Sequence, residues 1–545
     1  MIALTVALVL LLCWIGLIWF AVWRHAFWCR TTTRIHRHLS RPAIVVLAIA
    51  LIALPLGSAG LAWSRVACFG GGFDTAIRSE QGECVGVTGS GRHFSGELGE
   101  SSGDRARQRM DAVQDAITGE NAKLADDAPY LTVAVLVPID SALFGARLIH
   151  SLEGYAAAQR HINAQPVTPI RLVLGNIGAL EQQWRTAVDQ VVELSADPVH
   201  PLVAVVGLGL SRPEMAPMAR VLSDHQIPMV ADIATGDDIT GPEPTPGFYR
   251  VAYANSLQVN ALMKALPAIG ASFENVVVLR SGNRDDGYSR GAATLMAELL
   301  NNDFKDQLPR RQEPRDFGPY DDNYRPANDP SFESLALTLC GASGGSGTVF
   351  YSGRSLYLSI LLQQLQTSNK CSKVTVISIS DAAVLSISDR EAAEQPRWRV
   401  LEGKKALADG RVSLYYVPLA SPITSKAEPA YELLHRQFQE LGYPDSDLDT
   451  GYAINAWDAL TVVSKWITFT TERKRPLTAR EVFTATRDIL RGAGALPVWS
   501  GAGGGFCFDN RGDRQVAPGY CQGQSKLLPP VFQMRAEGPV PVPVG

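Results

Sequence analysis

A strand followed by a helix is predicted in the stretch YLTVAVLVPIDSALFGARLIHSLEGYAAAQRHIN (130–163). Its first part, LTVAVLVP (131–138), is an uncharged apolar run. In its second part, ARLIHSLEGYAAAQRHIN (146–163), apolar residues recur at the spacing of one helix face. Strands that are apolar along their whole length and alternate with helices are typical of a parallel sheet covered on both faces. The stretch therefore predicts the first strand and helix of an α/β fold.

The same alternation continues along the chain. Further strands are predicted at 170–177, 202–209, 228–233, 274–281, 347–353, 373–379 and 412–419. Further helices are predicted at 181–196, 215–226, 256–270, 289–302, 331–340, 354–366, 429–442 and 451–467. This order predicts an α/β fold class with two doubly wound parallel-sheet lobes that follow one another.

Two long apolar runs precede the α/β part. Residues 2–23 and 42–63 contain no charged side chain. At about 1.5 Å per residue each run reaches about 33 Å, which is enough to cross a hydrocarbon core of about 30 Å. A buried core helix is the alternative for either run, and a cleaved signal peptide is an alternative for the second. We predict transmembrane helices at 1–23 and 42–63.

The loop between these runs, residues 24–41, contains five arginines and no acidic residue. The positive-inside rule places such a short basic loop in the cytoplasm. The chain after residue 63 is then extracellular, and the protein is a multi-pass protein of the cell membrane. Because the whole chain has a net charge of −4, this extracellular part carries −9 (−4 minus 5). A nucleic-acid-binding surface would need a basic excess, so no nucleic-acid partner is expected.

Six cysteines lie in the part predicted to be extracellular: Cys68, Cys84, Cys340, Cys371, Cys507 and Cys521. An even number of cysteines in near-neighbour pairs is typical of disulfides in an oxidising compartment. We predict the pairs Cys68–Cys84, Cys340–Cys371 and Cys507–Cys521, although the sequence alone leaves other connectivities open. The short C-x2-C spacing of structural zinc sites does not occur, so no metal site is expected.

The remaining segments complete the domain organisation. Residues 64–129 are rich in Gly, Ser and Asp, and we predict an extracellular stalk with a disulfide loop and a short helix at 103–118. A two-lobe domain is predicted at 130–530. Lobe 1 is expected at about 130–252 and 420–470, lobe 2 at about 253–419 and 471–530, and a loose Pro-rich tail at 531–545.

Three short motifs could carry chemistry. GLGLSR (207–212) follows a strand, but Arg212 stands where a dinucleotide fingerprint needs its third glycine. The helix N-terminus at Ser211 suits an anionic ligand or serves as an ordinary N-cap. Asp381 lies at the carboxyl end of a predicted strand, where it could contact a ligand or cap a helix. GYSRG (287–291) matches the serine-hydrolase motif, but the polar residues before it prevent a tight strand-to-helix turn.

Several segments resemble, in order and spacing, those of one known family. They are VAVLVP with the helix ending at HIN163, VVGLGLSRPEMAPMARVLSDHQIPMVADIATGDDIT, GFYRVAYANSLQVNAL, DDGYSRG, VFYSGR and GYAINAWDALTVV. From about 130 to 530 the chain resembles type 1 periplasmic-binding-fold proteins of the branched-chain amino-acid (Leu/Ile/Val) binding class, the substrate-binding proteins of ABC transporters.

The resemblance implies a ligand site between two lobes that are joined by crossing strands. It implies that Ser211, Ala234 and Thr235 hold a ligand carboxylate, that Asp381 pairs with a ligand ammonium, and that the ring of Tyr288 covers the ligand. The first ligand loop, IDSALFG (139–145), departs from the small, polar, Gly-rich turn that is usual in the family.

The expected function is that of a membrane-anchored extracellular solute-binding protein. It would close its two lobes on a small ligand, an amino acid or a derivative, for transport or sensing. The expected partners are this ligand and a membrane permease or signalling protein, and neither catalysis nor a cofactor is expected. The alternative is a ligand-sensing or protein-contacting module that has lost small-molecule binding. A serine hydrolase with Ser289 as nucleophile is the third hypothesis.

Overall fold

The computed structural model describes most of the chain after residue 75. The described residues are 68, 76–88, 92–98, 103–124, 128–139, 147–239, 241, 243–318, 332–340, 345–368, 371–395, 398–491, 499–516 and 527–543. The predicted spans at 1–23 and 42–63 and the basic loop between them lie outside these residues. Among the described residues, no helix is both long enough and apolar enough to cross a membrane.

Contacts divide the chain into two compact units. The first comprises Met1–Gly70 and Arg78–Gln81 and includes the short strand β1 (Arg78–Glu80). The second comprises Gly71–Ile77 and Gly82–Gly545. Both lobes of the α/β domain belong to this second unit.

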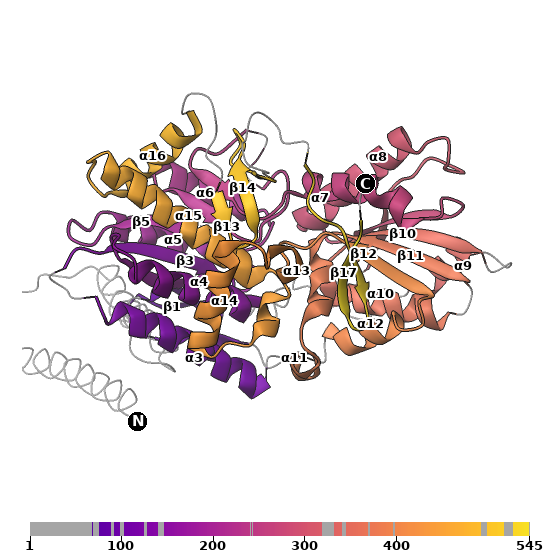
Figure 1. Cartoon of the computed structure of the whole chain (residues 1–545), viewed down its shortest axis with the longest axis horizontal. Helices are drawn as coiled ribbons and strands as arrows, with labels where there is room; N and C mark the ends of the chain where they lie inside the picture. Colours follow the sequence, from indigo (N-terminus) through magenta and orange to yellow (C-terminus); the bar gives the residue numbers. More distant parts are fainter. Residues whose placement is uncertain are drawn as a thin grey trace, which may run out of the picture. The chain divides into compact units, whose positions relative to one another are not determined.

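Lobe 1 is built on a sheet of mostly parallel strands (Figure 1). Its strands are β2 (Glu83–Thr88), β3 (Leu131–Val137), β4 (Ile170–Asn176), β5 (Leu202–Gly207), β6 (Met229–Ala231) and β7 (Phe248–Arg250). Their order is β2-β4-β3-β5-β6-β7, in which β2 runs antiparallel to β4 and the other pairs are parallel. β3 and β5 are buried along their whole length, as their apolar runs predicted.

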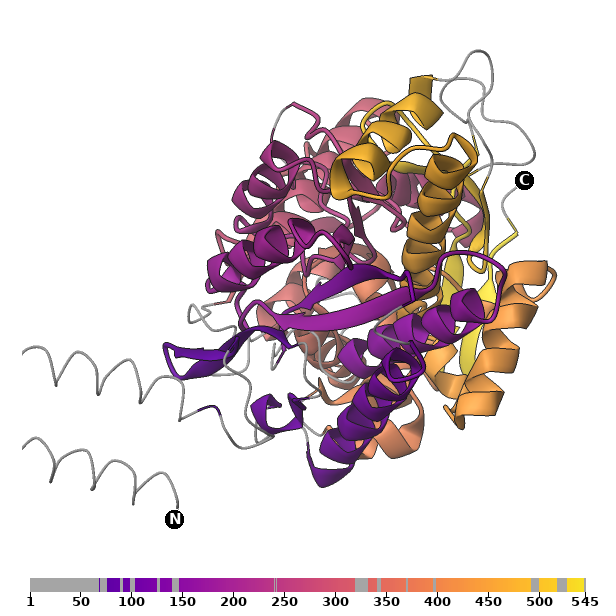
Figure 2. The same cartoon turned by 90° about the vertical axis from the view of Figure 1, so that its left-hand side faces the viewer.

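Helices cover this sheet, some packed on its strands and others packed on neighbouring helices (Figure 2). They are α3 (Gly103–Asn121), α4 (Arg147–Asn163), α5 (Trp184–Ser195), α6 (Met215–Asp224), α14 (Pro429–Leu441), α15 (Tyr452–Glu472) and α16 (Ala479–Arg491), with the short helices η1 (Ser95–Glu97) and η5 (Asp445–Leu448). α4 and α15 pack so closely that a Cβ at Gly154 would overlap the carbonyl group of Ala453. Glycine is therefore required at this helix crossing.

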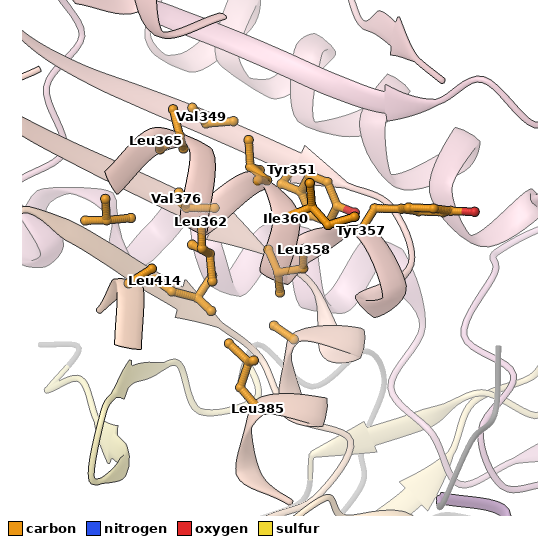
Figure 3. Close-up of a cluster of buried hydrophobic side chains, with 14 of the residues drawn as sticks. Val349, Tyr351, Tyr357, Leu358, Ile360, Leu362, Leu365, Val376, Leu385 and Leu414 are labelled. Carbon is orange, nitrogen blue, oxygen red and sulfur yellow. The ribbon is translucent and has the colours of Figure 1, made fainter. Parts of the chain in front are cut away.

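Lobe 2 repeats this architecture. Its strands are β8 (Val276–Ser281), β9 (Arg315–Phe317), β10 (Ser346–Ser352), β11 (Lys373–Ser378), β12 (Val412–Tyr416), β16 (Phe532–Arg535) and β17 (Gly538–Pro541), in the order β17-β16-β12-β11-β10-β8-β9. Its helices are α7 (Asn255–Ile269), α8 (Gly287–Asp303), α9 (Glu333–Cys340), α10 (Ser355–Thr367), η3 (Ser380–Ser386), α11 (Asp389–Glu394) and α12 (Val400–Ala406). Aliphatic side chains of β10, β11 and β12 pack with those of α10 and η3 in one buried cluster (Figure 3).

The chain passes between the lobes twice within the described residues. It enters lobe 2 between β7 and α7 and returns between β12 and α14, around the short helix α13 (Pro422–Ser425). The last described segment, which contains β16, belongs to lobe 2 again, and β16 pairs antiparallel with β12. These crossings place the carboxyl ends of both parallel sheets at the junction of the lobes.

The segment predicted as a stalk, residues 64–129, is instead packed onto lobe 1 over much of its described part. β2 pairs with β4, and α3 packs against α4. The physical reason is an apolar stripe on α3, in which Met110, Val113 and Ile117 are buried. The prediction rested on the Gly-, Ser- and Asp-rich composition of the whole segment, which does not reveal this stripe.

The C-terminal boundaries also differ from those predicted. The described residues from 471 to 516, expected in lobe 2, pack on lobe 1. α16 lies against α15 and β5, and the small antiparallel sheet of β13 (Trp499–Gly501), β14 (Gly504–Phe508) and β15 (Arg514–Val516) follows it. Arg514 anchors this sheet by donating to the carbonyl of Val251, 2.9 Å away.

In the tail predicted to be loose, 531–545, the described residues form a hairpin of β16 and β17 at the edge of the lobe 2 sheet. Backbone hydrogen bonds hold this edge, so it needs no long apolar run. The prolines of the segment are tolerated because an edge strand leaves one side unpaired.

The structure contains the predicted disulfide between Cys340 and Cys371. It joins the end of α9 to the residues before β11. Cys68, Cys84 and Cys507 also form disulfides. Cys521 lies outside the described residues, and the pairs Cys68–Cys84 and Cys507–Cys521 stay predictions.

Candidate functional site

A pocket of about 630 Å³ lies where the two lobes meet. One wall comes from the loops after β5 and β6, and the other comes from the end of β8 and from α8. A Cβ at Gly287 would lie 3.3 Å from the carbonyl oxygen of Ser211, so the walls touch at one edge. The carboxyl ends of parallel strands are the usual place for ligands in α/β sheets, which makes this pocket the candidate site.

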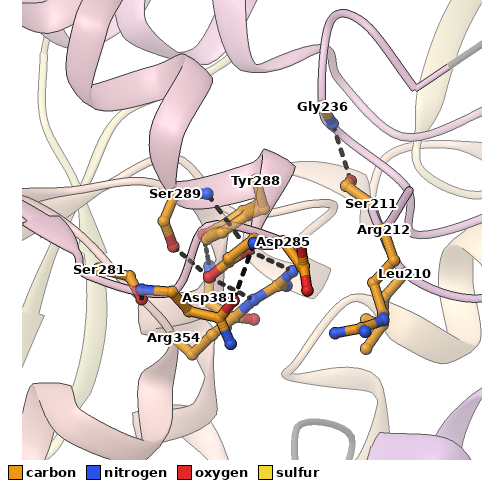
Figure 4. A network of polar contacts seen from close by, with 12 residues as sticks. Leu210, Ser211, Arg212, Gly236, Ser281, Asp285, Tyr288, Ser289, Arg354 and Asp381 are labelled. Carbon is orange, nitrogen blue, oxygen red and sulfur yellow. Dashed lines mark hydrogen bonds and ion pairs between the residues drawn. The ribbon is translucent and has the colours of Figure 1, made fainter. Parts of the chain in front are cut away.

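The lobe 1 corner of the pocket is organised by Ser211. Its Oγ accepts hydrogen bonds from the backbone N–H groups of Thr235 at 3.0 Å and Gly236 at 2.9 Å (Figure 4). The predicted residues Ser211, Ala234 and Thr235 are thus brought together, and all three are buried. Only Ser211 of these three lines the pocket, together with Gly236. The hydroxyl proton of Ser211 is the group that could be offered to an anion there.

Thr235 adds a second feature to this corner. Its Oγ1 is buried and makes no hydrogen bond in the structure. A buried hydroxyl without a partner costs free energy. A ligand or a water molecule that reached this oxygen would remove that cost.

Glu181, which no sequence motif singled out, lies behind the same loop. Glu181 is fully buried, and its Oε1 accepts from the backbone N–H of Leu210 at 2.6 Å. Burial raises the pKa of Glu181 to about 8. The carboxyl group is therefore largely protonated at neutral pH. A nonlocal contact of this kind leaves no local signal in the sequence.

The lobe 2 wall is built on the first turn of α8. Asp286 caps this helix, accepts from the hydroxyl of Ser289, and forms a buried ion pair with Arg354 at 2.8 Å. The guanidinium carbon of Arg354 lies 4.4 Å from the ring centroid of Tyr288. The predicted aromatic residue Tyr288 is thus covered by Arg354, and burial raises its pKa well above the ordinary value.

The position of Ser289 bears on the hydrolase hypothesis. Ser289 is fully buried, and its hydroxyl donates to the carboxylate of Asp286 within the helix cap. A nucleophile needs an adjacent general base and access to substrate. The capping role accounts for this serine without catalysis.

Asp381 already has a cationic partner within the chain. Its Oδ1 accepts from Nη1 of Arg147 at 2.8 Å, and its Oδ2 accepts from the backbone N–H of Ser355 at 3.1 Å. Its backbone N–H donates to Oη of Tyr288 at 2.9 Å, so the predicted pair Tyr288 and Asp381 are in contact. Arg147 begins α4 in lobe 1, and Asp381 lies in η3 of lobe 2. This buried ion pair therefore joins the two lobes.

A second buried charge cluster joins the lobes below the site. Arg109 of α3 donates to Glu153 at 2.8 Å, to Glu391 at 2.8 Å, and to Asp447. His150 contacts Glu391 through Nε2 at 3.1 Å. Glu391 lies in α11 of lobe 2, whereas the other four residues lie in elements of lobe 1.

The charges in this cluster shift one another's pKa values. Burial raises the pKa of Glu153 to about 8. Burial opposes the charge of Glu391, but His150 and Arg109 outweigh it and lower its pKa to about 2. Burial also opposes the charge of His150, but Glu391 and Asp447 raise its pKa.

Among the described residues, His150, Glu391 and Asp447 have the spacing of a metal site, with ligand atoms within 4.8 Å of one another. Arg109 contacts both carboxylates of this group. Its guanidinium supplies the positive charge that a metal ion would bring. The arrangement therefore favours an ion-pair cluster over a metal centre.

No protein-family model and no curated protein matches the chain. Solved structures of similar fold do. An ABC transporter substrate-binding protein from Desulfitobacterium hafniense in complex with Leu has a TM-score of 0.51 and 15% identity, over 76% of this chain and 99% of that chain. The leucine-binding protein LivK from Thermotoga maritima has a TM-score of 0.52 and 15% identity, over 75% and 97%.

A possible leucine/isoleucine/valine-binding protein from Rhodopirellula baltica has a TM-score of 0.50 and 12% identity, over 77% and 98%. Identities this low establish similarity of fold. The three structures named here are of substrate-binding or leucine-binding proteins. The two lobes and the crossings between them thus give this chain a fold similar to that of ABC-transporter substrate-binding proteins of the type 1 periplasmic-binding fold.

Proposed function

We propose that the chain is an extracellular solute-binding protein that is anchored in the cell membrane and closes its lobes on a small charged solute. The observation that carries this proposal is the pocket at the lobe junction, which both lobes line and which contains Ser211 at its corner. Closure around a solute requires groups from both lobes, because only contacts made in the closed state favour closure. The pocket offers such groups.

The pocket lining supports recognition of a solute with a carboxylate. Arg284 and Arg290 line it from lobe 2, opposite Ser211. Asp237 and Asp285 also line it, so the pocket can accept a cationic group as well. An amino acid satisfies both kinds of group. The leucine bound to the D. hafniense protein makes leucine the first solute to test.

A matched series of three compounds tests this proposal. Leucine carries both charges, 4-methylpentanoate lacks the ammonium, and 3-methylbutylamine lacks the carboxylate. We expect titration calorimetry on the full-length chain in mild detergent to show binding of the carboxylate-bearing compounds and none of the amine. Two outcomes would refute the proposal in this form. One is binding of the amine alone, and the other is that neither these three compounds nor a wider panel of amino acids binds.

Variants of the pocket arginines provide the structural control. Arg290→Gln removes a partly exposed charge that lines the pocket. Loss of one charged hydrogen bond costs about 1.5–3 kcal/mol, so affinity should fall by about 10- to 150-fold. Arg220→Gln changes an exposed arginine of α6 outside the pocket lining and should leave affinity unchanged.

The second candidate function is a module that contacts a protein partner and has lost small-molecule binding. The interlobe ion pairs favour it, because Arg147–Asp381 and Arg109–Glu391 close the lobes without a solute. This second function is favoured if no compound of a broad panel binds and none of them changes the small-angle X-ray scattering profile, which reports lobe closure.

A further inference from the structure

A buried guanidinium site lies at the lobe junction beneath the pocket. The carboxylate of Asp381 accepts from Nη1 of Arg147 at 2.8 Å, and Oγ of Ser355 accepts from Nη2 at 3.1 Å. The ring centroids of Trp398 and Tyr452 each lie 5.0 Å from the guanidinium carbon. A carboxylate, a hydroxyl and two aromatic rings are the groups that recognise a planar cation.

Lobe 2 holds its part of this site through contacts of its own. Oδ2 of Asp381 accepts from the backbone N–H of Ser355, and the backbone N–H of Asp381 donates to Tyr288. The carbonyl of Tyr288 in turn accepts from Asn255 at 2.9 Å. These bonds fix the carboxylate without Arg147. The acidic wall is therefore preorganised for a cation.

The cation is supplied by the other lobe. Arg147 is the first described residue of α4 in lobe 1, and its side chain is 1% exposed. We propose that the lobe junction contains a binding site for a guanidinium cation, that Arg147 is its built-in occupant, and that a small guanidinium compound takes the site when Arg147 is absent. The occupant thereby holds the lobes together without a solute. This inference does not depend on the proposed function, because neither Arg147 nor Asp381 lines the pocket proposed for the solute.

The geometry selects a guanidinium over an ammonium group. The two acceptors, on Asp381 and Ser355, are reached from two different nitrogens of Arg147. A guanidinium presents donors in a fixed planar fork, whereas a primary ammonium is a compact point charge. Ethylguanidinium should therefore occupy the site better than ethylammonium.

Chemical rescue tests the proposal. Arg147→Ala in the full-length chain leaves the acid and the rings in place and removes the occupant. We expect ethylguanidinium chloride to raise the melting temperature of this variant in a saturable manner, by about 2–4 °C. Wild-type protein should show no such rise, because Arg147 fills the site. Ethylammonium chloride at the same ionic strength is the control for salt and should have little effect.

A second variant ties the rescue to this site. In Arg147→Ala/Asp381→Asn the carboxylate is gone, so ethylguanidinium should no longer raise the melting temperature. Absence of rescue in Arg147→Ala, or equal rescue in the double variant, overturns the proposal. If Arg147→Ala fails to fold in plain buffer, the proposal requires that ethylguanidinium restore folding from denaturant and that ethylammonium not do so.

The leucine series provides an independent measurement of the pocket. Failure of the three compounds and of the wider amino-acid panel to bind the wild-type chain would refute the proposed function and leave the rescue result intact. Failure of rescue with normal solute binding would refute only the guanidinium site.

Discussion

The buried cluster around Arg109 makes stability depend on pH in a direction that can be worked out. Arg109 contributes +1, and Glu153, Glu391 and Asp447 contribute −3 when ionised, which leaves −2 in a buried place. Protons on His150 and Glu153 bring the sum to zero. The raised pKa values of these two groups agree with that count. The folded chain therefore holds protons that the unfolded chain releases near neutral pH.

The sign and size follow from linkage between proton binding and folding. Between its ordinary pKa of 4.5 and the folded value of about 8, Glu153 is protonated in the folded chain and ionised in the unfolded chain. Each such proton lowers the free energy of unfolding by about 1.4 kcal/mol per pH unit as pH rises. From about pH 5.5 to about pH 7.5 the loss from Glu153 alone is about 3 kcal/mol. His150 adds loss of the same sign above its ordinary pKa of 6.5.

The assay is urea unfolding of the full-length chain at several pH values, followed by tryptophan fluorescence. Glu153→Gln keeps the shape of the side chain and removes its proton equilibrium. We expect the unfolding free energy of this variant to fall with rising pH less steeply than that of the wild type, by about 1.4 kcal/mol per pH unit. Glu432→Gln, at an exposed position of α14, should keep the wild-type slope. An unfolding free energy that rises from pH 5.5 to 7.5, or a wild-type slope in Glu153→Gln, would refute the charge count.

Three further predictions concern packing, disulfides and topology. In thermal melts, Gly154→Ala should destabilise lobe 1 by about 3 kcal/mol because its Cβ would overlap the carbonyl of Ala453. Gly119→Ala, on the open face of α3, should instead stabilise the chain by about 0.5–1 kcal/mol in the same measurement. Cys340→Ala should cost about 3–4 kcal/mol, the closure entropy of a 31-residue separation, and thiol labelling of the folded wild-type chain should leave Cys340 unlabelled. Protease added to intact cells should digest the lobes but spare the loop 24–41, and protection of the lobes until lysis would contradict the proposed orientation.

The central strands could be predicted because burial on both faces leaves a strong local signal. β3, β5 and β11 are uncharged apolar runs at the sequence level, apart from Lys373, and each is largely buried in its sheet. α16 was missed although Val482, Phe483 and Thr486 lie on one buried face, because five charged residues among its 13 interrupt the apolar pattern. The hairpin of β16 and β17 was missed because it is held by backbone pairing with β12. Local sequence pattern does not encode such pairing.

The candidate site was predictable in the same limited way. Ser211 and Asp381 follow strands at their carboxyl ends, and chain order alone marks that position. Arg147 was not singled out, because nothing in ARLIH distinguishes a buried arginine from an exposed one. Its partner is Asp381, 234 positions away. Only the docking of lobe 1 on lobe 2 reveals that Asp381 already has a cation.

The ion pairs between arginines and carboxylates that join the lobes all have the same arrangement of charge. Arg105 and Arg109 of α3 pair with Glu394 and Glu391 of α11, and Arg147 of α4 pairs with Asp381. Lobe 1 supplies the cations and lobe 2 the carboxylates in each pair. Because two of the three arginines belong to α3, this helix contributes two of the ion pairs that hold lobe 1 against lobe 2. A force or a partner that displaced α3 would remove two of these ion pairs. Of the three, only Arg147–Asp381, together with any bound solute, would then hold the lobes together.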